Sequence, residues 1–296
     1  MKKLYIAPMA GVTDYAFRQI LKQYKPDLMY AEMVNSNLFI KEHKKTLNTI
    51  MKMSTDEKTG IQLFGSDMDE LIQNFSKLHE LGYTNLLLNM GCPQHKITKR
   101  GCGATLLDKI DEIEYLLASL KKKDIRISLK LRNCKNILNF FELANKYEIP
   151  YLCVHSRTKE EKFENEADFT LIHKLAKLDR NFDFIANGGI YSLEDYKKLQ
   201  NENIDGIMLA RGVIGRPWLI KEIKEGKKYS PSLQEVKEIV ISHMNYILED
   251  KGIKKASIEI NKFLEAYFKD FNVDVNKIIL EQDFEKKIEL VQSASL

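Results

Sequence analysis

A carboxamide and a thiol stand close together in the segment Asn89-Met90-Gly91-Cys92-Pro93. The segment follows the apolar run Leu86–Leu88, which is typical of a buried strand in a parallel sheet. We expect the strand to end here, because Gly91 permits a tight turn and Pro93 has no N–H to give to a sheet. A cysteine on such a turn can donate a proton or attack as a nucleophile, and the alternative is a small buried apolar residue.

The loop after this turn is basic and long for a connection between a strand and a helix. It runs from Gln94 to Gly103 and carries Lys96, Lys99 and Arg100. Loops of this length in a compact domain usually carry function. The position of Cys92 directly before this loop therefore favours chemistry over burial.

Polar and small residues also concentrate where other apolar runs end. Each of them alone has a structural explanation, such as a capped loop or a satisfied core histidine. Six of the eight runs end in polar groups, however, and reacting groups of a parallel barrel lie at the carboxyl ends of its strands. The residues at the run ends are Pro8, Met9, Ala10, Glu32, Gln62, Asn89, Cys92, Lys130, Arg132, His155, Arg157, Asn187, Gly188, Gly189, Ala210, Arg211 and Gly212.

The last two run ends have the composition of an anion site. Asn187-Gly188-Gly189 follows the seventh run, and Arg211-Gly212 follows the eighth. Glycines let backbone N–H groups approach an anion, and the arginine adds charge. Many barrels hold a phosphate at these two loops, so we expect a phosphorylated cofactor or substrate.

The remaining polar groups suit a flavin ring. Lys130 matches the N1–O2 edge, where negative charge accumulates when a flavin is reduced. Gln62 and Asn89 are able to hydrogen-bond the polar edge of the same ring.

Eight short apolar runs alternate with amphipathic stretches over about the first 225 residues. The helical stretches include 67–81, 110–120, 137–147 and 171–178, and Asp14, Asp67 and Ser192 stand at expected helix starts. This alternation predicts a (β/α)8 TIM barrel, with an open doubly wound sheet as the alternative. The apolar runs are 4–9, 28–31, 60–64, 85–89, 125–131, 151–155, 182–187 and 206–210.

The pattern changes after Trp218. Residues 226–232 have the composition of a linker, and the residues beyond 232 have a helical pattern. One apolar stripe runs from Val236 to Ile247, and a second, aromatic stripe runs from Ile260 to Phe271. We therefore expect a catalytic barrel over residues 1–228 and an all-helical domain over residues 229–296.

Composition excludes several classes of protein. Of 296 residues, 44% are hydrophobic and 30% are charged, which is typical of a globular chain rather than a disordered one. No apolar run approaches the roughly 20 residues that span a bilayer, and the N-terminus lacks a signal-peptide core. The four cysteines have no metal-ligand spacing, so we expect reduced thiols, a cytoplasmic location and no metal. The net charge of +4 permits a polyanionic partner.

Several motifs together resemble the tRNA-dihydrouridine synthases. Residues 7–14, with Phe17-Arg18, are similar to the opening motif of that family, and 89–93 are similar to its catalytic signature. Further matches occur in the family's order at 130–132, 155–158, 187–190 and 210–218. The resemblance covers residues 4 to about 220 closely.

The resemblance implies a barrel that binds FMN tightly and reduces the 5,6 double bond of particular uridines in tRNA, with NADPH as the electron source. Cys92 would be the acid that protonates C5 of uracil. A thiol with an ordinary pKa near ~8.5 is mostly protonated at neutral pH, so it is able to donate. The cofactor residues carried over by position are Pro8, Met9, Ala10, Gln62, Asn89, Lys130, His155, Asn187, Gly188, Gly189, Ala210 and Arg211.

The expected partner is tRNA. We expect the chain to be a monomer and not to associate with a membrane. A uridine inside folded tRNA must leave its stack to reach the flavin. Lys96, Lys99, Arg100 and Arg157 are expected to meet the surrounding phosphates. The alternatives are an FMN barrel acting on a free pyrimidine, similar to dihydroorotate dehydrogenases, and a flavin-holding RNA-binding protein without turnover.

Overall fold

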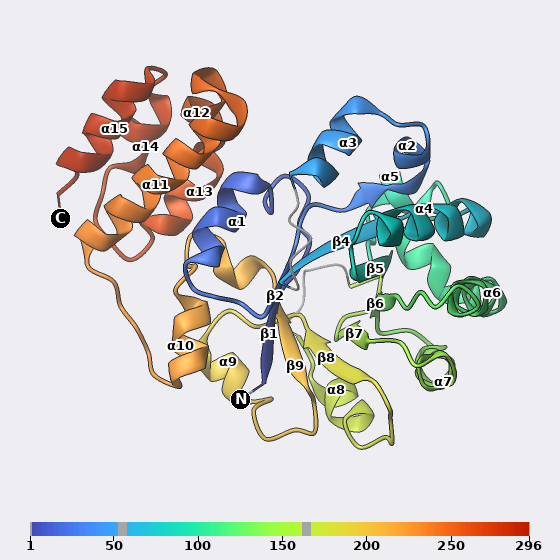
Figure 1. Cartoon of the computed structure of the whole chain (residues 1–296). Helices are drawn as coiled ribbons and strands as arrows, with labels where there is room; N and C mark the ends of the chain where they lie inside the picture. The colour runs from blue at the N-terminus through green and yellow to red at the C-terminus, as the bar shows by residue number, and fades with distance from the viewer. Residues whose placement is uncertain (1, 53–57, 162–166, 296) are drawn as a thin grey trace.

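The computed structural model describes residues 2–52, 58–161 and 167–295. Within these residues nine parallel strands form one closed sheet, and helices surround it (Figure 1). The predicted (β/α)8 barrel is therefore confirmed. The strands are β1 Lys3–Ile6, β2 Leu28–Tyr30, β3 Val34–Asn35, β4 Thr59–Phe64, β5 Asn85–Met90, β6 Ser128–Arg132, β7 Tyr151–His155, β8 Asp183–Asn187 and β9 Gly206–Leu209.

The two short strands β2 and β3 are one barrel strand that a bulge interrupts. Met29 of β2 is paired with Thr59 of β4, whereas Val34 of β3 is paired with Leu63. The six residues from 29 to 34 thus oppose the five residues from 59 to 63, so one extra residue is accommodated between the paired positions. The expected end of this strand at residue 31 was too early, because pairing resumes after the bulge. The bulge places Glu32 and Met33 near the end of the barrel.

Each barrel strand is followed by at least one helix, because parallel neighbours need a crossover connection. Predicted helix positions agree to within a few residues, and Asp14, Asp67 and Ser192 each accept a backbone N–H at a helix start. The helices around the barrel are α1 Tyr15–Lys22, α2 Ser36–Ile40, α3 Lys44–Met51, α4 Met68–Glu80, α5 His95–Thr98, α6 Ile110–Lys121, α7 Ile137–Tyr147, α8 Thr170–Leu175, α9 Leu193–Lys197 and α10 Leu219–Glu225. Two 3₁₀ turns, η1 Gly103–Asp108 and η2 Arg211–Val213, complete the connections.

The barrel interior is filled with side chains below the carboxyl ends of the strands. Tyr5, Tyr30 and Tyr151 are buried there together, and the hydroxyl groups of Tyr30 and Tyr151 share a hydrogen bond. Cys153 and Met208 pack in the same cluster. The interior is therefore a packed core rather than a channel, and any cavity must lie above it.

A C-terminal helical region follows the barrel, after a linker that begins at Gly226. The region packs beside α1 (Figure 1). Ser232 opens α11 with a capping box, which agrees with the predicted end of the linker. Its helices are α11 Leu233–Lys251, α12 Ile253–Glu259, α13 Asn261–Tyr267, α14 Val275–Leu280 and α15 Phe284–Ser293.

The contact between barrel and helical region is aromatic and buried. Phe17 of α1 lies 5.1 Å from Phe263 and 5.6 Å from His243 between ring centroids. His243 is fully buried, and its Nδ1 lies 3.2 Å from the Tyr267 hydroxyl. The two apolar stripes predicted from the sequence therefore cover part of the barrel. None of the helices in the described ranges has the length and apolar character needed to cross a membrane.

We expect this contact to lose stability in mild acid. Burial, with the ammonium groups of Lys262 and Lys251, lowers the pKa of His243 from 6.5 to about 4, although Asp14 opposes the shift. Below pH 6.5 the unfolded chain takes up a proton that the folded chain does not. The free energy of unfolding should therefore fall by up to about 3 kcal/mol between pH 6.5 and pH 4 from this residue alone.

Urea unfolding at several pH values between 4.5 and 7.5 measures this contribution. The matched control carries His243→Phe together with Tyr267→Phe, so that the tyrosine hydroxyl does not lose its partner. Other groups titrate in both proteins, and only the difference between the two curves belongs to His243. Parallel curves for the two proteins would contradict the assignment.

Candidate active site

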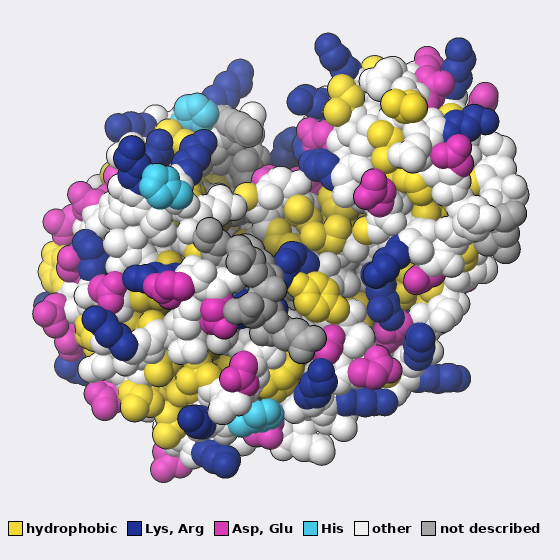
Figure 2. Space-filling model, turned by 180° about the vertical axis from the view of Figure 1, so that it is seen from behind, with side chains coloured by type: hydrophobic (Ala, Val, Ile, Leu, Met, Phe, Trp, Pro, Cys, Tyr) yellow, Lys and Arg dark blue, Asp and Glu magenta, His cyan; other side chains and the backbone are white. Residues whose placement is uncertain are grey.

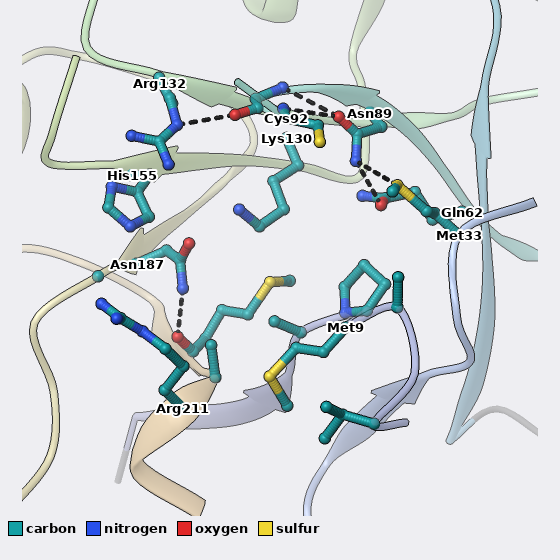
Figure 3. Close-up of a pocket in the computed structure, with 18 of the residues that line it drawn as sticks. Met9, Met33, Gln62, Asn89, Cys92, Lys130, Arg132, His155, Asn187 and Arg211 are labelled. Atoms are coloured by element: carbon teal, nitrogen blue, oxygen red, sulfur yellow. Dashed lines mark hydrogen bonds between the residues drawn. The ribbon is translucent and has the colours of Figure 1, made fainter. Parts of the chain in front are cut away.

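One cavity of about 370 Å³ lies at the carboxyl ends of the strands. Figure 3 shows the side chains of Gln62, Asn89, Lys130, His155 and Arg211 around it. The structure brings every residue expected to bind a cofactor into this wall, together with Cys92. The predicted residues in the wall are Pro8, Met9, Ala10, Gln62, Asn89, Cys92, Lys130, His155, Asn187, Gly188, Gly189, Ala210 and Arg211.

The turn that carries Cys92 is organised by Asn89. The Oδ1 atom of Asn89 accepts the backbone N–H groups of Gly91, at 3.1 Å, and of Cys92, at 3.0 Å. Its Nδ2 atom donates to Gln62 Oε1 at 2.8 Å. The sequence predicted a cofactor contact for Asn89, but these three bonds make it the support of the turn. The Asx-type arrangement is common where a short polar side chain bonds its own chain two or three residues on.

The backbone carbonyl of Cys92 in the same turn also has a hydrogen-bond partner. The backbone N–H of Ala104 donates to the Cys92 oxygen at 3.0 Å, and a Cβ atom on Gly103 would lie only 2.7 Å from that oxygen. Gly103 has a φ of +62°, which a glycine adopts readily. Cys102 packs in a small apolar cluster against which Cys92 also lies. The end of the basic loop, at residues 102–104, therefore contacts Cys92 and supports it.

Arg132 lies in the cavity wall although it was not among the cofactor or substrate residues expected from the sequence. Its Nε donates to the Gly91 oxygen at 2.7 Å, and its Nη1 donates to the Thr158 oxygen at 2.7 Å. The residue is 2% exposed, and burial lowers the pKa of its guanidinium to about 10. The sequence did contain a signal, because Arg132 shares a strand face with Lys130 two positions earlier.

Gln62 and Lys130 present donors to the cavity. Gln62 Oε1 is occupied by Asn89, whereas the buried Nε2 has no hydrogen-bond partner within the described residues. The Lys130 side chain extends into the same space (Figure 3). Burial, with Arg132 nearby, lowers the pKa of Lys130, while the neighbouring thiols of Cys153 and Cys92 act in the opposite direction. A ligand with acceptor atoms on one edge would satisfy both donors.

His155 is a neutral donor at this site. Its Nδ1 accepts the backbone N–H of Arg157 at 3.1 Å, so the ring proton resides on Nε2. Burial lowers the pKa of His155 to about 2, and the cations of Lys130, Arg132, Arg157 and Arg211 contribute in the same direction. A Cβ atom on Gly188 would lie 2.8 Å from the Nε2 atom. The glycine therefore keeps this side of the ring accessible.

The predicted anion site is built from the ends of β8 and β9. Gly188 and Gly189 have φ values of +96° and +72°, which present their backbone without a side chain. Arg211 lies across the Tyr191 ring, with its guanidinium carbon 5.5 Å from the ring centroid. Asn187 contributes structure, because its Nδ2 donates to the Met208 oxygen at 2.6 Å. Glycine backbone and an arginine together suit a phosphate group.

The floor beside β1 is apolar. Met9 has both backbone groups engaged within its own turn, since its N–H donates to Thr13 Oγ1 at 2.8 Å and its oxygen accepts from Val12 and Thr13. Its side chain is therefore the part offered to a ligand. Met33 and Met208 also line the cavity, and the sequence patterns did not single them out. Polarizable methionine side chains adapt well to a flat aromatic surface.

The four expected substrate residues do not form part of the cavity wall. Lys96, Lys99 and Arg100 are exposed on and after α5, whereas Arg157 is only 4% exposed. The three exposed cations therefore lie outside the cavity, on the surface of the molecule. Within the described ranges no group of three or more His, Cys, Asp or Glu side chains is arranged to hold a metal ion.

Comparison with known proteins identifies similar chains. The family model described as "Dihydrouridine synthase (Dus)" matches residues 5–294. The tRNA-dihydrouridine synthase B of Vibrio vulnificus is 33% identical over 262 residues, which cover 84% of this chain and 81% of that protein. The tRNA-dihydrouridine synthase B of Pasteurella multocida is 30% identical over 280 residues, covering 90% of this chain and 83% of that protein.

One further relative and one solved structure are also similar to this chain. The probable tRNA-dihydrouridine synthase 1 of Synechocystis is 31% identical over 279 residues, covering 90% of this chain and 78% of that protein. The crystal structure of TcOYE with pHBA superposes with a TM-score of 0.51 at 10% identity, covering 77% of this chain and 90% of that one, and shows a similar fold. With a family model that spans nearly its whole length, the chain belongs to the dihydrouridine synthase family.

Proposed function

We propose that this chain reduces the 5,6 double bond of particular uridines in tRNA to give dihydrouridine. The observation that carries the proposal is the placement of Cys92. Its thiol stands at the edge of a cavity with flavin-compatible donors, on a turn that Asn89 and Arg132 hold in place. Binding alone would not need a proton donor at this position. Membership of the family supports the same reaction.

The cavity fits FMN. The unpartnered Gln62 Nε2 and the Lys130 ammonium are donors for the acceptor edge of the ring. At the other side, His155, Gly188, Gly189 and Arg211 provide donors and charge for the ribityl chain and phosphate. Pro8, Met9, Ala10 and Ala210 supply apolar contact. We infer tight, non-covalent binding of FMN and an electron supply from NADPH.

FMN bound in this cavity would supply the hydride for C6 of uracil. The chain's own residues supply the rest of the reaction. Cys92 holds a proton on Sγ and delivers it to C5, where negative charge develops. Asn89 fixes the direction of the thiol through the backbone of residues 91 and 92, and Arg132 prevents the turn from moving away. The apolar wall excludes water from the reacting atoms.

The tRNA is held across the open side of the barrel. Figure 2 shows the surface hollowed between the barrel and the helical region, with lysine and arginine side chains around it. We propose that residues 1–228 form the catalytic unit and that residues 229–296 form a helical domain that contacts tRNA. Lys96, Lys99 and Arg100 meet phosphates near the extruded uridine, and the buried Arg157 donates its backbone N–H to His155 of the cavity wall. The chain acts as a monomer in the cytoplasm.

One assay tests the function directly. The purified protein, FMN and NADPH are incubated with unmodified tRNA, and nucleosides are analysed for dihydrouridine. Formation of dihydrouridine in tRNA supports the proposal. Reduction of a free pyrimidine with no change in tRNA would instead indicate an enzyme similar to dihydroorotate dehydrogenases. Flavin binding without either product would indicate a binding protein.

Replacing Lys130 with methionine should weaken FMN binding. The substitution keeps the approximate length of the side chain and removes its charged donor. Loss of one charge-assisted hydrogen bond in a buried site corresponds to roughly 10- to 100-fold in the dissociation constant. Fluorescence titration of FMN measures the change. Lys96→Met is the control, because Lys96 is exposed outside the cavity, and it should bind FMN like the unmodified protein.

Replacing Cys92 with alanine should leave FMN binding and its reduction by NADPH intact. Neither step requires a proton at C5 of uracil. Oxidation of the reduced enzyme by tRNA should slow by about 10²–10⁴-fold, the usual contribution of a positioned acid. Stopped-flow absorbance of the flavin separates the two steps. Reoxidation at the unmodified rate would show that another group donates the proton.

The control for this experiment is Cys134→Ala. Cys134, like Cys92, is partly exposed, but it lies outside the cavity wall. Cys102 is a less suitable control because it is buried and packs beside Cys92. We expect Cys134→Ala to react with tRNA at the unmodified rate, and Cys102→Ala to show a small loss from the disturbed packing.

A further inference from the structure

The backbone of Gly11 is held from two directions, through its N–H group and through its carbonyl oxygen. Its N–H donates to Glu32 Oε1 at 2.6 Å, and its oxygen accepts from Lys262 Nζ at 3.0 Å. Glu32 lies in the bulge of the second barrel strand, and Lys262 lies on α13 of the helical region. Gly11 has a φ of +73°, and it is exposed. A short turn of the barrel is thus fixed on one side by the barrel and on the other by the C-terminal helices.

The lysine is itself part of a connected set of charges. Lys262 lies 3.6 Å from Glu259 Oε2, and the same carboxylate pairs with Lys251 at 2.7 Å. Lys251 also pairs at 2.6 Å with Asp14, which caps the start of α1. These contacts bring the helical region to both ends of the segment from Gly11 to Asp14. Burial alone would lower the pKa of Lys251, but its hydrogen bonds and ion pairs with Asp14 and Glu259 together raise this pKa above its usual range.

The segment held in this way forms one wall of the cavity. Met9, Ala10 and Val12 line it, and the turn is closed by bonds from Val12 and Thr13 to the Met9 oxygen. Because these residues are bonded to one another, a shift of Gly11 would move the wall with it. A Cβ atom built on Gly11 would meet no other atom within 4 Å, so no packing against that position prevents such a shift.

We propose that Lys262 is a positioning residue for the cofactor, acting through the Gly11 oxygen to hold the turn of residues 8–12 against the flavin. The helical region then sets the affinity for FMN before any tRNA is bound. This inference rests on the proposed function, since it takes FMN as the ligand of the cavity. It gives the helical region a second role, distinct from contact with RNA.

Lys262 is suited to this role rather than to general stabilisation. Its side chain is 44% exposed, and an ion pair so accessible to water contributes little to folding. A single directed bond to a backbone oxygen nevertheless selects one position of the turn. Replacing Lys262 should therefore change the affinity for FMN rather than the stability of the fold.

The experiment uses the full chain, freed of flavin and titrated with FMN in the absence of tRNA. Lys262→Met removes the donor, and Lys262→Arg retains one. Lys255→Met is the matched control, because Lys255 lies in the same cleft and approaches Glu259 at 3.9 Å. Glu32→Gln tests the hydrogen bond that the backbone N–H of Gly11 donates, because it removes the charge of the acceptor with little change of shape.

Lys262→Met should raise the FMN dissociation constant by roughly 3- to 10-fold, as expected for one lost hydrogen bond. It should also shift the visible absorption of bound FMN, because the wall that packs on the ring moves. Lys262→Arg should restore most of the affinity, Glu32→Gln should weaken it, and Lys255→Met should leave it unchanged. Thermal unfolding of the flavin-free proteins should be the same for all of these variants.

Two results would overturn the inference. One is an FMN affinity and spectrum for Lys262→Met that match those of the unmodified protein. The other is an equal loss in Lys255→Met, which would indicate a general effect of charge in the cleft. Failure of the proposed function looks different, since the unmodified protein would then bind no FMN or form no dihydrouridine.

Discussion

Closure of the parallel sheet is the constraint on which the rest of the structure depends. It requires β1 to pair with both β2 and β9, so that every strand ends at the same rim. Closure also brings Tyr30 against β4 at Gly60, where any side chain would clash with the tyrosine ring. Because the interior below the rim is filled, residues distant in sequence meet in a single cavity above it. The Cys92 thiol, Lys130 and the anion site are neighbours for this reason alone.

The direction in which each polar group points is decided by its second partner rather than by its residue type. Asn89 and Asn187 both stand at strand ends and have the same functional group. The carboxamide of Asn89 bonds Gln62 and the turn that carries Cys92, whereas that of Asn187 donates to the neighbouring strand β9. Gln62 keeps one donor for a ligand because Asn89 occupies its oxygen. A network of this kind makes the site sensitive to residues that never contact the substrate.

The sequence predicted much of the fold and the site, since buried parallel strands leave continuous apolar runs and functional groups follow them. It could not predict the bulge after β2, which depends on pairing with β4 rather than on local composition. The contact of Arg132 with Gly91 joins residues 41 positions apart, and no periodic pattern records it. The aromatic stripe around Phe263 indicated a buried face, but Phe17 as its partner became visible only in the folded chain.

That aromatic contact also has a consequence for synthesis of the protein. Phe17 leaves the ribosome well before Phe263, which follows it 246 positions later in the chain. At about 5–20 residues per second, synthesis of these 246 residues takes roughly 12–50 s. For most of that time the outer face of α1 has no cover, although the nearby strands are already complete. The nascent barrel therefore presents an apolar surface until α11 and α13 have been made and can cover it.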